Sequence, residues 1–240
     1  MFGPVFRRKR ETGIRSVRGR ACRATARPAA VGGAVGLLLA VSAPPGAAAT
    51  DGVPPPDKIV IDVVSVNGSG CPLGSAIVAV SPDNTAFTVS YSSYVAQVGV
   101  GSKPTDARKN CQLSLNVHVP QGFTYAVAKA DYRGFAKLEK GATALQRATY
   151  YFQGMSQTAY MNHPFAGPLN DGWQTSDTTE IDALIYAPCG AVRYFNINTE
   201  LRVDAGTSDP AKTNSFMAMD STDGSINTLY HFAWKQCPAR

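Results

Sequence analysis

Apolar and polar residues alternate along two stretches of this chain, and this period of two constrains the fold more than any other feature. Residues 112–119 read QLSLNVHV, so every second residue from Leu113 to Val119 is apolar. Side chains of a β-strand point alternately to its two faces. We therefore expect a strand with one buried face and one polar face, and His118 lies on the polar face.

The stretch 192–204 repeats this pattern. One-sided strands of this kind are typical of antiparallel sheets that pack one face on the core. We expect the buried face to carry Phe195, Ile197, Thr199, Leu201 and Val203. We expect the exposed face to carry Tyr194, Asn196, Asn198, Glu200, Arg202 and Asp204.

Short runs of β-branched and aromatic residues recur between Gly, Pro, Asn and Asp in the rest of the chain, and tight turns are expected at 81–84 and 120–122. No stretch after residue 50 sustains a helical period. The sequence predicts an all-β fold, an antiparallel two-sheet sandwich with jelly-roll-like connections. Strands are expected at 59–66, 76–80, 85–92, 112–119, 123–132, 147–163, 179–186, 192–204 and 225–235.

Residues 1–49 have the features of a secretory signal peptide. An Arg-rich segment precedes an apolar run of roughly thirteen residues, and small residues at 47–49 follow. Since a membrane-spanning helix needs about 20 apolar residues, we expect an exported chain without a stable membrane anchor. We expect a Pro-rich linker at 50–57 and a single β-sandwich domain at 58–240, secreted and extracellular.

The charge of the chain belongs mostly to this leader. Residues 1–50 carry nine of the 23 Lys and Arg residues and one of the 17 acidic residues, which leaves a net charge of −2 on residues 51–240. Nucleic-acid binding requires basic residues on the folded domain. The sequence therefore predicts no nucleic-acid partner.

Four of the five cysteines lie beyond the leader, as expected for an oxidised, exported domain. Four cysteines allow three pairings, and sequence alone does not select one. We favour Cys71 with Cys111 and Cys189 with Cys237, each bond closing a loop of roughly 40–50 residues. A zinc site is the alternative, but the chain has no Cys-x-x-Cys or Cys-x-x-His spacing.

Several stretches resemble one known family, the secreted domain of unknown function 4360 of bacteria and fungi. They include VNGSGCP at 66–72, RKNCQLSLNVHVPQGFTYAVAKADYRGFA at 108–136, FNINTELRV at 195–203 and the C-terminal 215–237. The resemblance covers about 59–237. It implies secretion and a small disulfide-containing domain, and it supplies no catalytic residues.

The sequence offers few candidates for catalytic residues. The three histidines lie far apart in sequence, and the chain has no Gly-x-Ser-x-Gly motif. Acidic residues provide the remaining route, because a glycoside hydrolase uses two carboxyl groups in one cleft. The candidates are Asp131, Asp177, Glu180, Asp182 and Glu200, and the sequence predicts no catalytic residue, metal site or cofactor beyond this possibility.

Trp173 is the candidate ligand-binding residue. It follows Asn170, Asp171 and Gly172 in what we expect to be a loop, where its ring would offer a stacking surface for a sugar. The same residue could fold back onto the core, and we favour this second interpretation.

The leading functional hypothesis is a secreted, non-enzymatic protein that binds an extracellular glycan, an envelope component or a protein. The alternatives are a secreted carbohydrate-active hydrolase with paired carboxylates and a structural envelope component. The distance between the carboxyl groups in the folded domain would distinguish a binding protein from a hydrolase.

Overall fold

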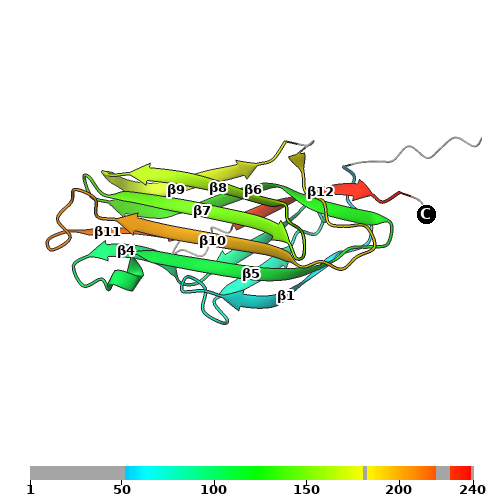
Figure 1. Ribbon diagram of the computed structural model, residues 1–240, viewed down its shortest axis with the longest axis horizontal. Helices are drawn as coiled ribbons and strands as arrows, with labels where there is room; N and C mark the ends of the chain where they lie inside the picture. The colour runs from blue at the N-terminus through cyan, green and yellow to red at the C-terminus, as the bar shows by residue number, and fades with distance from the viewer. Residues whose placement is uncertain (1–51, 181–182, 220–227, 239–240) are drawn as a thin grey trace, which may run out of the picture. The chain divides into compact units, whose positions relative to one another are not determined.

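A computed structural model describes residues 52–180, 183–219 and 228–238 of the chain, so the leader lies outside the described residues. The described residues form twelve strands and one short 3-10 helix (Figure 1). The strands are β1 (Val60–Asn67), β2 (Ala76–Val80), β3 (Ala86–Tyr91), β4 (Tyr94–Gly99), β5 (Arg108–His118), β6 (Phe123–Leu138), β7 (Thr143–Phe152), β8 (Thr158–Ala166), β9 (Leu169–Thr178), β10 (Phe195–Asp204), β11 (Asn214–Met219) and β12 (Thr228–Gln236); the 3-10 helix is η1 (Pro104–Asp106).

These strands form two antiparallel sheets, which confirms the predicted all-β sandwich. One sheet has five strands in the order β1-β5-β10-β7-β8, seen from bottom to top in Figure 1. The other has seven strands, with β2-β3-β12-β6-β11-β4 in order and β9 paired to β6. The chain passes repeatedly from one sheet to the other, so residues distant in sequence become neighbours.

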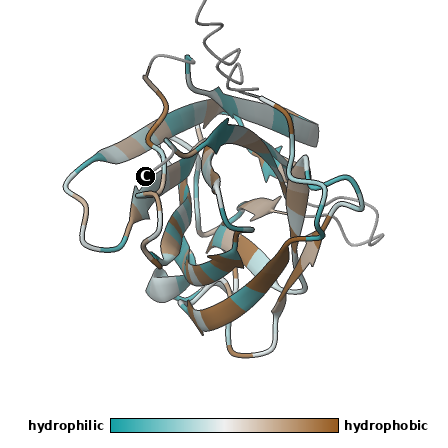
Figure 2. Cartoon of the chain, turned by 90° about the vertical axis from the view of Figure 1, so that its right-hand side faces the viewer, coloured by the Kyte–Doolittle hydropathy of each residue, from teal (hydrophilic) through white to brown (hydrophobic). Residues whose placement is uncertain are grey.

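The core lies between the sheets, and hydrophobic and hydrophilic residues alternate in bands along the strands (Figure 2). In β5, Leu113, Leu115 and Val117 are buried and His118 is exposed, as predicted. In β10 the expected inward residues are also buried, but so are Asn196 and Glu200, which we expected to be exposed. β10 is the central strand of its sheet, so its outward side chains have the neighbouring strands β5 and β7 on both sides.

Several strand boundaries differ from the prediction. The stretch expected as one strand at 147–163 forms two, β7 and β8, joined by a turn in which the amide of Met155 donates to the carbonyl of Phe152. The described residues of the predicted strand at 179–186 lie in the loop before β10. Strands β4, β9 and β11 were not predicted.

Strand β9 shows why the sequence did not predict some of these strands. Its sequence, LNDGWQTSDT, lacks alternating β-branched residues. It is nevertheless a strand because all ten of its residues pair with β6, from Leu169 opposite Leu138 to Thr178 opposite Lys129. Tertiary pairing overrides a weak local preference here.

Both favoured disulfides form. Cys71 bonds Cys111 with Cα atoms 5.3 Å apart, which ties the β1–β2 connection to β5. Cys189 bonds Cys237 with Cα atoms 5.8 Å apart, which ties the loop before β10 to the residue after β12.

The described part of the Pro-rich segment, residues 52–57, is held against the domain. Buried Asn84 donates through Nδ2 to the carbonyls of Pro55 and Asp57, at 3.0 and 2.8 Å. Its Oδ1 accepts a bond from the Ile59 amide at 3.1 Å. The amide of Gly52 also donates to the carbonyl of Trp234 at 2.9 Å. No helix among the described residues is long and apolar enough to cross a membrane.

Candidate functional site

The outer side of the five-stranded sheet carries polar side chains in three adjacent cross-strand rows, which we call the polar face. Strand register defines each row, because residues directly opposite on paired strands point to the same side. Every residue in these rows bears an amide, hydroxyl, carboxylate or guanidinium group. The rows are Ser65, Ser114, Asn196, Tyr151 and Thr158; Asn67, Gln112, Asn198, Thr149 and Tyr160; and Asn110, Glu200, Arg147 and Asn162.

The middle row, Asn67–Gln112–Asn198–Thr149–Tyr160, is called the amide row. Among the residues that the structure describes, the side chains of Gln112, Asn198, Thr149 and Tyr160 make no hydrogen bond. The Oδ1 atom of Asn198 is buried without a partner at the centre of the sheet. Buried polar atoms are usually paired, so this row holds unused hydrogen-bonding capacity.

Two tyrosines lie at the β7–β8 side of the polar face. Tyr160 on β8 is 65% exposed, and Tyr151 on β7 is half-buried in the next row. A tyrosine ring supplies apolar contact area together with a hydroxyl group. The face therefore combines hydrogen-bonding groups with an exposed aromatic ring.

Two arginines hold a buried carboxylate at one corner of the polar face, and a third lies opposite it on β7. Arg108 donates to Glu200 at 2.5 Å, and Arg202 lies 3.4 Å from the other oxygen of the same carboxylate. Arg147 lies opposite Glu200 on β7 and donates through Nε to Asn162 at 2.6 Å. Hydrogen bonding and charge attraction from Glu200 raise the pKa of Arg108. We call this group the arginine corner.

Trp173 does not lie in a loop. It lies on β9 with 6% of its surface exposed, and its Nε1 donates to the carbonyl of Ala218 at 3.2 Å. Its ring contacts Phe165 edge to face, with centroids 5.5 Å apart. Because its ring is buried in the core, Trp173 offers no surface for a ligand in this structure.

The carboxylates named as hydrolase candidates lie on different surfaces. Asp131 and Asp177 are on neighbouring strands, but their side chains point to opposite faces of the seven-stranded sheet, because Asp177 pairs with Ala130 and Ser176 pairs with Asp131. Glu200 lies on the outer side of the other sheet. Glu180 is exposed after β9, and Asp182 lies outside the described residues.

Asp131 belongs to a polar cluster on the outer side of the seven-stranded sheet. Partial burial raises its pKa, but hydrogen bonds from Lys129, Ser176 and His231 outweigh this effect and lower the pKa overall. The carboxylate lies 2.8 Å from Lys129 Nζ and 3.0 Å from His231 Nε2.

Asp177 belongs to a buried network that bridges the two sheets. It accepts from the Tyr150 hydroxyl at 2.5 Å and bonds His163 Nε2 at 2.6 Å, and Tyr150 also bonds the hydroxyl of Tyr132. Burial raises the pKa of both tyrosines well above the usual value. The two tyrosine hydroxyls therefore stay neutral in the core, where their hydrogen bonds connect the two sheets.

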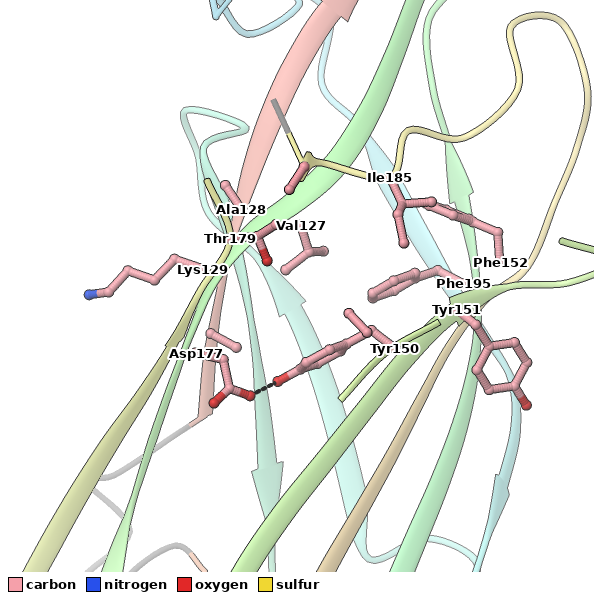
Figure 3. Close-up of a pocket in the computed structure, with 13 residues that line it drawn as sticks. Val127, Ala128, Lys129, Tyr150, Tyr151, Phe152, Asp177, Thr179, Ile185 and Phe195 are labelled. Carbon is pink, nitrogen blue, oxygen red and sulfur yellow. Dashed lines mark hydrogen bonds between the residues drawn. The ribbon is translucent and has the colours of Figure 1, made fainter. Parts of the chain in front are cut away.

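Figure 3 shows the cavity beside this network, with Asp177 and Tyr150 at one end and Phe152, Ile185 and Phe195 at the other. Its volume is about 40 Å³ and its lining is mostly apolar. A cavity of this size has room for one or two water molecules, not for a sugar ring.

A wider groove of about 790 Å³ lies between residues 116–125 and the loop at 187–193, next to the Cys189–Cys237 disulfide. Asn116 and His118 form part of its wall. Both residues are on the outer side of β5, the side that also carries Gln112 and Ser114. β5 therefore connects this groove to the polar face.

The three histidines each bond a different aspartate: His118 bonds Asp62, His163 bonds Asp177 and His231 bonds Asp131. Among the described residues, no group of three His, Cys, Asp or Glu side chains could hold a metal ion.

Sequence reasoning located the β5 and β10 parts of the polar face, because both strands alternate clearly. It missed Arg147, Thr149, Tyr151, Tyr160 and Asn162, because 147–163 was expected to be a single strand. The signal that could have divided it is QGMSQ at 153–157, a short polar segment with a glycine between two runs rich in aromatic residues.

Comparisons with solved structures return low similarity. The structure of TmCBM61 in complex with beta-1,4-galactotriose has a TM-score of 0.29 and 11% identity, over 72% of this chain and 88% of that chain. The enzymatically active domain of bacteriophage CBA120 tailspike protein 4 has a TM-score of 0.23 and 12% identity, over 75% of this chain and 19% of that chain. Neither likeness is close enough to inform the function.

The sequence comparisons are more specific. An uncharacterized secreted protein of Arthroderma benhamiae is 36% identical over 184 residues, which cover 77% of this chain and 74% of that protein. The two disulfides agree with the oxidising compartment that a secreted protein enters. The model of a domain of unknown function, DUF4360, matches residues 57–237, and the chain therefore belongs to the DUF4360 family.

Proposed function

We propose that this chain is a secreted glycan-binding protein and that the polar face is its binding surface. The amide row carries the proposal, because its side chains make no hydrogen bonds within the described residues and because it ends at the exposed ring of Tyr160. A glycan presents many hydroxyl groups and apolar ring faces. Amide and hydroxyl side chains form hydrogen bonds with the sugar hydroxyl groups, and an aromatic ring packs against the apolar face of a sugar ring.

The composition of the face favours a glycan over a protein partner. Stable protein interfaces have an apolar core surrounded by a polar rim. The three rows are polar throughout, including their central positions at Asn198 and Thr149. A ligand that is itself rich in hydroxyl groups matches such a surface better.

The position of the carboxylates favours binding over hydrolysis. A glycoside hydrolase places two carboxyl groups about 5–10 Å apart in one cleft. On the polar face, Glu200 is bonded to Arg108 and lies 3.4 Å from Arg202, and it is the only carboxylate in the three rows defined above.

The experiment measures binding of the purified domain to a panel of soluble polysaccharides, by affinity electrophoresis or calorimetry. Tyr160→Ala should weaken binding about two- to twelvefold, since an aromatic contact contributes roughly 0.5–1.5 kcal/mol. Asn198→Ala should also weaken it, through loss of the amide.

Phe135→Ala is the matched control, because Phe135 is a partly exposed aromatic residue on the other sheet. It should bind like the wild type. The proposal is wrong if no polysaccharide binds, or if Phe135→Ala reduces binding as much as Tyr160→Ala does.

A further inference from the structure

The arginine corner contains an arrangement that the sheet alone does not explain. Arg108 on β5 lies directly opposite Arg202 on β10. Like charges at directly opposite positions of neighbouring strands destabilise a sheet. Both guanidinium groups are nevertheless on the outer side, with side chains 54% and 53% exposed.

One carboxylate balances these charges only in part. Glu200 is bonded to Arg108 and approached by Arg202, and its side chain is 9% exposed, so it is enclosed between them. Arg147, the third cation, faces Glu200 from β7. Two guanidinium groups thus share one carboxylate, and a third lies in the neighbouring position of the same row without an ion pair to Glu200 among the described residues.

The other charged group on this side of β10 is Asp204, one row beyond Arg202. Its Oδ1 accepts a hydrogen bond from the Gly206 amide at 2.7 Å, and no ion pair joins it to Arg202 among the described residues. Even with Asp204 included, the corner keeps an excess of positive charge. This excess adjoins the amide row, because Glu200 and Asn198 are alternate residues of one strand.

We propose that the arginine corner binds the carboxylate groups of an acidic polysaccharide, one built from uronic acid units. The inference rests on the proposed glycan-binding role of the polar face and specifies its ligand class. A guanidinium group matches a planar carboxylate with two parallel hydrogen bonds. The amide row and Tyr160 then contact the sugar rings while the corner holds the charged substituent.

The test uses two forms of one polymer, polygalacturonate and its fully methyl-esterified derivative. Both have the same backbone, but the ester has no negative charge. We expect polygalacturonate to bind about tenfold more tightly at low ionic strength. The difference should shrink as salt rises above 0.1 M, because charges about 10 Å apart are then largely screened.

Two variants of Arg202 locate the effect. Arg202→Gln removes the positive charge and should abolish most of the preference for the acid form. Arg202→Lys keeps the charge but cannot form two parallel hydrogen bonds with a carboxylate, so it should retain part of the preference. Lys137→Gln is the control, because Lys137 is an exposed cation on the other sheet and should not change the preference. Melting temperatures check that each variant is folded.

The outcomes separate the two proposals. Equal binding of both polymers, weakened by Tyr160→Ala, would overturn the acidic-ligand inference and leave glycan binding in place. A preference for polygalacturonate that Arg202→Gln leaves unchanged would also overturn it. If no polysaccharide binds at all, both proposals fail.

Discussion

Replacing Trp173 by alanine should destabilise the domain strongly, because the structure uses this residue in the core. Only 6% of the surface of Trp173 is exposed. Its indole packs against Phe165 and donates a hydrogen bond to the carbonyl of Ala218. It also lies against Gly134, where an added Cβ would come within 2.6 Å of the ring. Gly134 has no side chain that could move into the space left by the indole.

The expected magnitude follows from these contacts. Replacing a buried tryptophan by alanine costs about 3–5 kcal/mol, and a cavity that cannot collapse belongs at the upper end of this range. Loss of the bond to Ala218 adds about 1 kcal/mol or less. In a domain of this size, 1 kcal/mol shifts the melting temperature by roughly 2–4 °C, so a total loss of about 4–6 kcal/mol should lower the melting temperature by about 8–24 °C.

The assay is urea unfolding at equilibrium, with thermal melting alongside. Tyr160→Ala is the control, because this 65% exposed residue should change the free energy of unfolding by only about 0.5 kcal/mol. Iodide quenching in a Trp234→Phe background reports on Trp173 alone, and we expect weak quenching. A melting temperature within about 2 °C of the wild type, with strong quenching, would refute the buried position.

Three further predictions concern the disulfides, a turn and the leader. Replacing both cysteines of either disulfide by alanine should lower the free energy of unfolding by about 4 kcal/mol, measured by urea unfolding; an unchanged midpoint would contradict it. Hydrogen bonds from Ser81 and Thr85 lower the pKa of Asp83 to about 2. The stabilisation from Asp83 should therefore be complete above its ordinary pKa of 3.8 and be lost as the pH falls through about 2, so wild type and Asp83→Asn should converge in stability near pH 2; an NMR titration midpoint near 4 would be inconsistent with this. We also propose cleavage of the leader after Ala49, which N-terminal sequencing of the exported protein tests; secreted chains that begin near residue 1 would exclude it.

Part of the candidate site could be predicted from the sequence. The polar side of β5 follows from strict alternation at 112–119, and most of the polar side of β10 follows in the same way. Trp173 shows where this reasoning stops. Its neighbours resemble a loop, and only pairing of β9 with β6 makes the segment a strand and turns the indole inward.

The sequence by itself determined the all-β class, the inward and outward sides of β5 and the inward side of β10, and the family of the chain. These properties are local, because side-chain direction in a strand depends only on the position of a residue along that strand. The tertiary structure decided which strands are neighbours. Tyr160 lines up with Asn198, and Arg108 and Arg147 flank Glu200, only because β7 lies between β8 and β10 and β5 lies on the other side. Such neighbours are set by long-range pairing across two packed sheets, which no local pattern of residues encodes.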